Sequence, residues 1–265
     1  MMSRLDVYLC EHGIAKSRER AKNLIKGGKV NVNGSICTKP AYEVGENDEI
    51  AAQPDDLKYV GRGGLKLAKA FEVFDLNVDG AVCADIGAST GGFTQCLLEH
   101  DAKTVYAVDV GHSQLDESLL NDRRVVNCEG VNARDLTSDS FPKRPSFISV
   151  DVSFISLELI IGALSSLLDE NGEIVALIKP QFEAGKKALN KKGIVKDQKD
   201  HIRVLEKLVC AFNSADLTVN DIIPSSITGG DGNIEYLAYM RKEPQAEIKS
   251  FDLDRLVKSA FLQFK

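Results

Sequence analysis

The stretch VCADIGASTGGF, residues 82–93, decides the fold class of this 265-residue chain. Its first five residues form a run of strand length, and the glycine-rich turn that follows is typical of the passage from a β-strand into a helix. In a parallel α/β sheet, ligands bind outside the carboxyl ends of the strands. The turn after Ile86 is therefore the expected ligand site, and its glycines would let the backbone approach a ligand closely.

Runs of strand length recur along the chain, and helix-like stretches separate several of them. The strand candidates are Val82–Ile86, Val105–Val110, Arg124–Cys128, Phe147–Val152, Ile174–Ile178, Asp221–Ile223 and Glu235–Met240. The helix candidates are Gly92–Glu99, Leu157–Leu168, Asp200–Ala215 and the C-terminal Phe251–Phe264. This alternation predicts a doubly wound α/β domain with a mostly parallel sheet. No helix separates the last two strands, so the last one is expected to pair antiparallel.

The spacing of the glycines favours S-adenosylmethionine (SAM) over a dinucleotide as the ligand. The turn reads D-x-G-x-x-x-G rather than the G-x-G-x-x-G of dinucleotide-binding folds. Asp85 and the loop amides would hold the methionine end of SAM, and Asp109, which ends the next strand, would accept hydrogen bonds from its ribose. A tight turn without a ligand is the alternative interpretation. The expected cofactor-binding residues are Asp85, Gly87, Ser89, Thr90, Gly91, Gly92, Phe93, Asp109, Asn132, Ala133 and Asp151.

Four ionisable residues lie where a sheet of this order would bring them together. Lys66 precedes the first strand, Asp151 ends the fourth, Lys179 follows the fifth and Glu235 begins the last. Burial at the end of an apolar strand would favour the neutral amine of Lys179, whereas the two carboxylates would favour its ammonium form. A lysine placed in this way can hydrogen-bond a ribose 2′-hydroxyl or remove its proton. Solvated surface charge is the alternative interpretation of each residue taken alone.

The first 40 residues are basic, although the whole chain has a formal net charge of −6. They hold eight Lys and Arg against three acids, and residues 41–56 then hold six acids and no base. Ser3 is expected to cap a first helix, with Asp6 at the capping-box position, and Ser17 is expected to cap a second helix. The Asn-Gly turn in VNVNG, residues 30–34, predicts a β-hairpin after the two helices.

On the second of these helices, Arg18, Lys22 and Lys26 are spaced to form one basic stripe. Phosphate contacts of such a stripe position a protein on RNA without reading its sequence. A solvated charged face is the alternative interpretation. The candidates for RNA contact are Arg4, Arg18, Arg20, Lys22, Lys26 and Lys29 in this segment, and Arg62, Arg134, Lys186, Lys187, Lys191 and Lys192 beyond it.

Several motifs, taken in order, resemble one known family. YVGRGGLKL, ADIGASTGGFT, VYAVDVGHSQL, VDVSFISL, LIKPQFE and GGDGNIEYL, all within residues 59–242, resemble the FtsJ-like ribose 2′-O-methyltransferases. Residues 3–50 resemble the S-four-type RNA-binding module, and the whole chain resembles the TlyA (hemolysin A) family of rRNA methyltransferases. The resemblance implies a small α+β RNA-binding domain over residues 1–56 and a Rossmann-like SAM-dependent methyltransferase domain over residues 57–265.

The same resemblance implies a reaction and its partners. The product would be a 2′-O-methylated cytidine in large-subunit rRNA, and in some family members also in small-subunit rRNA. The implied catalytic set is Lys66, Asp151, Lys179 and Glu235, with SAM as the cofactor and no metal. The partners would be rRNA or ribosomal subunits, and the location would be the cytoplasm.

Composition argues against other classes of protein. No apolar run reaches the roughly 18–20 residues that cross a bilayer, and the N-terminus lacks the apolar core of a signal peptide. The six cysteines have no C-x-x-C spacing, and the four histidines form no metal-ligand pattern. Two alternatives stay open. A hemolysin-like membrane-active protein would be revealed by liposome leakage, and a non-catalytic RNA-binding protein by a SAM titration.

Overall fold

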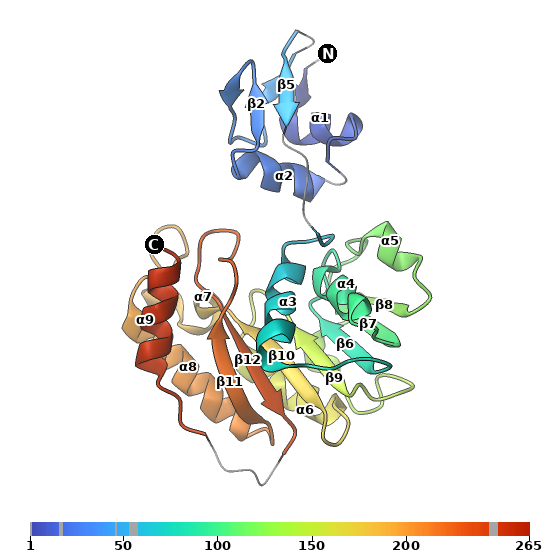
Figure 1. Cartoon of the computed structure of the whole chain (residues 1–265), viewed down its shortest axis with the longest axis vertical. Helices are drawn as coiled ribbons and strands as arrows, with labels where there is room; N and C mark the ends of the chain where they lie inside the picture. The colour runs from blue at the N-terminus through green and yellow to red at the C-terminus, as the bar shows by residue number, and fades with distance from the viewer. Residues whose placement is uncertain (1, 16–17, 46, 53–57, 244–248) are drawn as a thin grey trace. The chain divides into compact units, whose positions relative to one another are not determined.

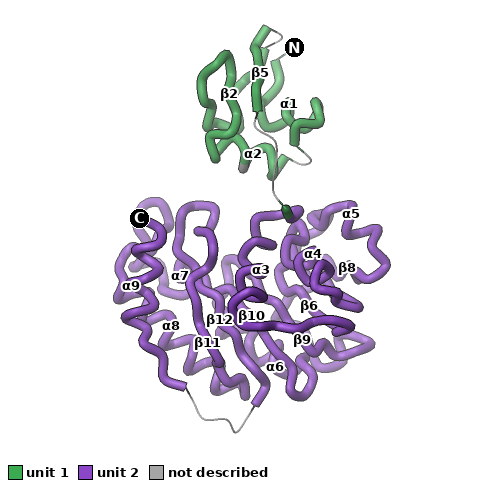
Figure 2. The backbone as a smooth tube through the Cα atoms, in the orientation of Figure 1, with its two compact units in different colours: residues 1–58 green, residues 59–265 purple. Residues whose placement is uncertain are grey.

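The computed structural model describes residues 2–15, 18–45, 47–52, 58–243 and 249–265. The chain divides into two compact units, residues 1–58 and 59–265, which Figure 2 colours separately. The boundary expected from the sequence lies two residues earlier, after residue 56. Each unit has a hydrophobic core of its own. Within the described ranges, no helix is both long enough and apolar enough to cross a membrane.

The first unit packs two helices against short strands. Its elements are β1 (Ser3–Arg4), α1 (Leu5–Glu11), α2 (Arg18–Lys26), β2 (Val30–Val32), β3 (Ser35–Ile36), β4 (Glu43–Val44) and β5 (Ile50–Ala52). Strand β2 pairs antiparallel with β3 across the Asn-Gly turn and with β5 on its other side, and β1 pairs antiparallel with β4. The predicted hairpin is therefore confirmed. Leu5, Leu9, Leu24 and Ile25 fill the core between the helices.

The start of the first helix differs from the expectation. Ser3 belongs to β1, and no side chain caps α1. The first helical amides find backbone partners instead, because Leu5 N donates to Tyr42 O and Asp6 N to Pro40 O. The carboxylate of Asp6 is fully buried and accepts hydrogen bonds from Arg4 at 2.9 and 3.0 Å. The expected cap at Ser17 lies outside the described residues.

The second unit is built on a seven-stranded sheet of order β11-β12-β10-β9-β6-β7-β8. Its strands are β6 (Val82–Ile86), β7 (Thr104–Asp109), β8 (Val125–Glu129), β9 (Phe147–Val150), β10 (Glu173–Ile178), β11 (Thr218–Pro224) and β12 (Tyr236–Arg241). The five strands from β10 to β8 pair parallel with their neighbours. Strand β12 pairs antiparallel with both β10 and β11. The expected α/β sheet with an antiparallel last strand is confirmed.

Helices cover both faces of this sheet (Figure 1). Leu67, Phe71, Leu97 and Leu119, from α3, α4 and α5, pack on one face, and side chains of α6, α8 and α9 pack on the other. The helices are α3 (Gly63–Phe74), α4 (Gly92–Glu99), α5 (Glu117–Leu120), α6 (Ile161–Leu167), α7 (Pro180–Glu183), α8 (Gln198–Asn213) and α9 (Leu253–Gln263). Short 3-10 turns lie at Ala133–Asp135, Leu157–Leu159 and Lys186–Ala188. The predicted helix over Leu157–Leu168 is thus a 3-10 turn followed by α6.

Helix α3 is not among the helices expected from the sequence. It begins with Gly63 and Gly64, and glycine has low helix propensity. Its buried face, which includes Leu67, Ala70 and Phe71, supplies the stability through packing on the sheet. The helix carries Lys66, one of the four expected catalytic residues, on this buried face.

Candidate active site and cofactor pocket

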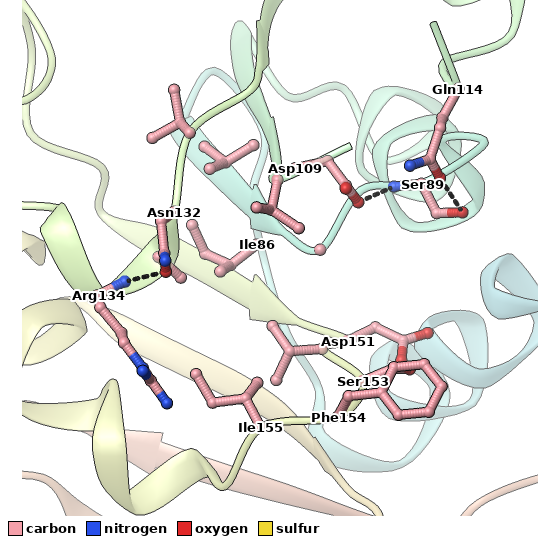
Figure 3. A pocket seen from close by; sticks show the side chains of 16 residues that line it. Ile86, Ser89, Asp109, Gln114, Asn132, Arg134, Asp151, Ser153, Phe154 and Ile155 are labelled. Atoms are coloured by element: carbon pink, nitrogen blue, oxygen red, sulfur yellow. Dashed lines mark hydrogen bonds between the residues drawn. The ribbon is translucent and has the colours of Figure 1, made fainter. Parts of the chain in front are cut away.

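A cavity of about 480 Å³ lies at the carboxyl ends of β6, β7 and β9, where the sequence predicts the ligand site. Figure 3 shows the side chains that line it. The lining includes six of the expected cofactor residues, namely Gly87, Ser89, Asp109, Asn132, Ala133 and Asp151. Thr90, Gly91, Gly92 and Phe93 are not part of the lining but belong to the turn and the start of α4.

The carboxylate of Asp109 is held at the cavity wall by two backbone donors. Ser89 N donates to Oδ2 at 2.8 Å, and Gly111 N donates to Oδ1 at 2.7 Å. Gln114 lies beside it, and its Oε1 accepts a hydrogen bond from Ser89 Oγ at 3.4 Å (Figure 3). Gln114 is not among the cofactor-binding residues expected from the sequence, although its place just after the strand that ends in Asp109 is a signal for such a role. The result is an oriented carboxylate acceptor on the wall of the cavity.

Asp85 has a different place from the one expected. It does not line the cavity, and its fully buried carboxylate accepts hydrogen bonds from Thr94 Oγ1 at 2.7 Å and Ser149 Oγ at 3.1 Å. Burial raises the pKa of Asp85 to about 7, although both hydrogen bonds act in the opposite direction. Asp85 therefore supports the glycine turn from inside the protein. This corrects the expectation that it contacts the methionine end of a ligand directly.

Two glycines permit close backbone contacts around the turn. Gly87 has φ +85°, and a Cβ at this position would lie 2.5 Å from Asp151 O. A Cβ at Gly92 would lie 2.9 Å from Gly64 N, so the starts of α3 and α4 meet backbone to backbone. A side chain at either position would push Asp151 or α3 away from the turn. These contacts explain why the motifs GRGG, residues 61–64, and TGGF, residues 90–93, lie next to each other.

The four expected catalytic residues form two ion pairs. Lys179 Nζ lies 2.5 Å from Asp151 Oδ1, and Lys66 Nζ donates to Glu235 Oε2 at 2.6 Å. Helix α3 links the two pairs, because a Cβ on its first residue, Gly63, would lie 3.5 Å from Asp151 Oδ2. Of the four residues, only Asp151 lines the cavity.

One aromatic ring, that of Phe182, lies near the Lys179 ammonium, and a second ring packs against it. Lys179 Nζ donates to Ser153 Oγ at 2.9 Å and lies 5.9 Å from the centroid of the Phe182 ring. The Phe154 ring packs at an angle against Phe182, with 5.0 Å between the ring centroids. Phe154 itself is 91% exposed, lines the cavity and has φ +65°. A bulky residue rarely adopts this left-handed conformation, so Phe154 is a strained, exposed aromatic side chain beside the ion pair.

In the first unit, the expected RNA-contact residues differ in their exposure and in their partners. Arg18, Lys26 and Lys29 are exposed and Lys22 is half-buried, which leaves them accessible to a partner. Arg20 is only 6% exposed, so the expectation that it faces RNA is wrong: its side chain belongs to the interior of the unit. Arg4 is exposed but hydrogen-bonds the buried Asp6, and this bond lowers the pKa of the Asp6 carboxyl.

The remaining candidates for RNA contact lie in the second unit. Arg134 lines the cavity, and the Arg62 guanidinium donates to Thr228 O at 3.0 Å, which ties the start of α3 to the loop before β12. Lys179 is followed directly by α7, and α7 is followed by a segment that we call the lysine loop, residues 185–193. All four of its lysines are exposed: Lys186, Lys187, Lys191 and Lys192.

Comparison with known proteins agrees with this architecture. A sequence model of the FtsJ-like methyltransferase family matches residues 59–242, and one of the S4 domain matches residues 3–50. YqxC of Bacillus subtilis (strain 168), provisionally described as an rRNA methyltransferase, is 45% identical over 89% of this chain and 85% of its own. The 16S/23S rRNA (cytidine-2′-O)-methyltransferase TlyA of Mycobacterium tuberculosis is 38% identical over 97% of both chains.

A solved structure extends the comparison to three dimensions. A Streptococcus thermophilus protein provisionally described as a hemolysin aligns with a TM-score of 0.80 and 41% identity, over 99% of this chain and 97% of that one. The resemblance stated from the motifs is thereby confirmed over nearly the whole chain. The chain belongs to the FtsJ-like methyltransferase family and carries an S4 domain in front of the methyltransferase domain.

Proposed function

We propose that this protein transfers a methyl group from SAM to the ribose 2′-hydroxyl of a cytidine in ribosomal RNA. The observation that carries the proposal is the Lys179–Asp151 ion pair, whose carboxylate lines the same cavity as the oriented carboxylate of Asp109. The cytidine and the ribosomal RNA come from relatives such as the Mycobacterium tuberculosis TlyA, whose name states both. Action on ribosomal RNA implies a cytoplasmic location.

The cavity suits SAM by its hydrogen-bond acceptor and its apolar lining. Asp109 presents a fixed acceptor for ribose hydroxyls, because two backbone amides already orient it. Apolar side chains of Val110, Val131 and Ile155 line another part of the cavity and suit a flat purine ring. Gly87 lets the turn pack against the backbone of Asp151, and both residues line the cavity. Bound SAM supplies an electrophilic methyl group on a positively charged sulfur.

In the proposed reaction, the protein acts on the nucleophile. Lys179 would first release the proton of its ammonium to solvent. Its Nζ would then accept the proton of the 2′-hydroxyl as that oxygen forms its bond to the methyl group and the bond between the methyl group and the donor sulfur breaks. Asp151 then stabilises the Lys179 ammonium through the ion pair that the structure contains. Ser153 Oγ fixes the direction of Nζ. A general base of this kind contributes about 10²–10⁴-fold to the rate.

Three features support an RNA substrate. The S4 match and the exposed cations of the first unit fit contacts to phosphate. The lysine loop adds four exposed cations just after Lys179 in the chain. The exposed Phe154 ring offers a stacking surface beside the ion pair, and a base that leaves its helix stacks on such rings.

The experiment is to map ribose methylation on rRNA from cells with and without the gene, together with a SAM titration of the purified protein by calorimetry. We expect one or more cytidines to lose their 2′-O-methyl group when the gene is absent. Methyl transfer from labelled SAM to that rRNA should restore them. Identical methylation maps in the two strains, or no heat of SAM binding, would contradict the proposal. Liposome leakage without RNA tests the membrane-active alternative, and we expect none.

A further inference from the structure

Glu129, the last residue of β8, holds a loop next to the cavity through three backbone hydrogen bonds. Ser113 N donates to its Oε2 at 2.9 Å, and Gln114 N and Leu115 N donate to its Oε1 at 2.7 and 3.1 Å. These bonds, with that of Gln114 the strongest, lower the pKa of Glu129 to about 2. The carboxylate is therefore charged at any pH at which the protein works.

The three amides belong to consecutive residues that point at one acceptor. Such a set of backbone N–H groups is an anion-binding concavity. Here the chain supplies the anion itself. Ser113 has φ +55°, a left-handed conformation that a non-glycine residue adopts only when its surroundings enforce it. Ser113 and the two residues after it donate their backbone hydrogen bonds to Glu129, and these bonds hold Ser113 in the left-handed conformation.

The loop held in this way, residues 110–115, forms a wall of the cavity. Its first part is tied to Asp109, because Gly111 N donates to Asp109 Oδ1 at 2.7 Å, and Gly130 N in turn donates to Gly111 O at 3.0 Å. Its second part places the side chain of Gln114 against the glycine turn at Ser89 (Figure 3). Glu129 touches neither the cavity nor the expected catalytic residues.

We propose that Glu129 is a positioning residue of the cofactor pocket. Its carboxylate is a built-in anion that closes the loop 110–115 beside Asp109 and thereby sets the affinity for SAM, not the rate of methyl transfer. This inference rests on the proposed function, because it takes SAM as the ligand of the cavity. Loss of the carboxylate leaves three converging amides without their acceptor, and the strained turn at Ser113 then opens.

The test compares Glu129→Ala and Glu129→Gln with two matched variants. Asp122→Ala is the control, because Asp122 lies just before β8, where it accepts Arg124 N at 2.9 Å and pairs with the Arg124 side chain at 2.8 Å, away from the loop 110–115. Asp109→Ala removes the proposed ribose acceptor. Calorimetry gives the Kd for SAM and for its demethylated product, and single turnover at saturating SAM gives the transfer rate.

For Glu129→Ala we expect both Kd values to rise about tenfold or more, with the transfer rate at saturating SAM within about threefold of wild type. For Glu129→Gln the Kd values should lie between those of wild type and Glu129→Ala. The side-chain oxygen of Gln can still accept a hydrogen bond, but its NH₂ group is a donor that faces the donating backbone amides. Amide hydrogen exchange should show lost protection at Ser113–Leu115 in both variants, and this readout needs only the folded Glu129→Gln protein.

Unchanged SAM affinity in folded Glu129 variants would overturn the inference, and so would an equal loss of affinity in Asp122→Ala, which would indicate general destabilisation. Failure of the wild type to bind SAM would overturn the proposed function and, with it, this role of Glu129. Binding by the wild type with loss in Asp109→Ala but none in the Glu129 variants would leave the proposed function standing and remove only the positioning role.

Discussion

The Lys66 ammonium lies 2.6 Å from Glu235 Oε2, and the side chains are 9% and 2% exposed, so this ion pair is buried between α3 and the start of β12. The Lys179–Asp151 pair is the more exposed of the two, and its carboxylate lines the cavity. Two ion pairs of similar chemistry, each a lysine with a carboxylate, therefore have different surroundings. The buried pair joins residues that are 169 positions apart, which ties α3 to the sheet.

Breaking the buried ion pair between Lys66 and Glu235 should lower the stability of the folded protein. In Lys66→Met, the Glu235 carboxylate is left in the interior without its partner, and we expect the free energy of unfolding to fall by about 3–5 kcal/mol. The double variant Lys66→Met/Glu235→Leu removes both charges and should regain most of this loss. Urea denaturation measures the free energy of unfolding of the single and the double variant. A double variant as unstable as the single one would contradict this account.

Lys179→Ala should abolish most methyl transfer without loss of the cofactor. Removal of a general base lowers the rate about 10²–10⁴-fold, and SAM affinity should stay within a few-fold because Lys179 does not line the cavity. Lys207→Ala is the matched control, since Lys207 pairs with Glu158 at 2.5 Å on the surface of α8. The role assigned to Lys179 is wrong if the variant keeps more than about a tenth of the wild-type single-turnover rate.

Phe154→Ala should weaken the use of RNA more than the binding of SAM. Stacking of a base on an aromatic ring contributes about 1–3 kcal/mol, so kcat/KM for rRNA should fall about tenfold or more. Phe154→Tyr keeps the ring and should retain activity. Leu159→Ala removes another exposed apolar side chain, 59% exposed, and serves as the control. Equal kcat/KM values for the alanine and tyrosine variants would rule out stacking.

Replacing Arg18, Lys22 and Lys26 together by Ala should lower RNA affinity by a similar factor for cognate and unrelated RNAs, because backbone contacts carry little sequence information. The log–log salt dependence should flatten by about 0.9 for each duplex phosphate that the variant no longer neutralises. A triple change of exposed lysines in the second unit, Lys199, Lys207 and Lys258 to Ala, removes the same charge and is the control. Identical salt slopes for the two triple variants would show that α2 presents only a solvated face.

The stability of the second unit should depend on pH through Asp85. Its pKa is about 7 in the folded protein and about 3.8 when exposed, so the folded state binds more protons between these values. This contribution to stability is complete below about pH 4 and is lost as the pH rises through 7, a change on the order of 4 kcal/mol. Denaturation at several pH values should show this decline in wild type and its absence in Asp85→Asn, which stays neutral. An unchanged decline in the variant would assign it to another group.

The sequence alone determined the sheet and the edge at which the site lies. The predicted runs Val105–Val110, Phe147–Val152 and Ile174–Ile178 place Asp109, Asp151 and Lys179 at or beside the carboxyl ends of strands, and parallel strands bring such ends to one edge. The Asn-Gly turn fixed the hairpin of the first unit for a similarly local reason, since only a few turn types fit it.

Tertiary structure decided what depends on contacts between distant residues. Helix α3 forms in spite of two glycines because its apolar face packs on the sheet. The stability that comes from this packing cannot be predicted from the local sequence pattern. The burial of Asp85, Asp6 and Arg20, and the three amides gathered around Glu129, follow from the way remote segments fold together. The sequence does not show whether a charged residue lies in water or in the interior, because burial is a property of the whole packed unit and not of the residue.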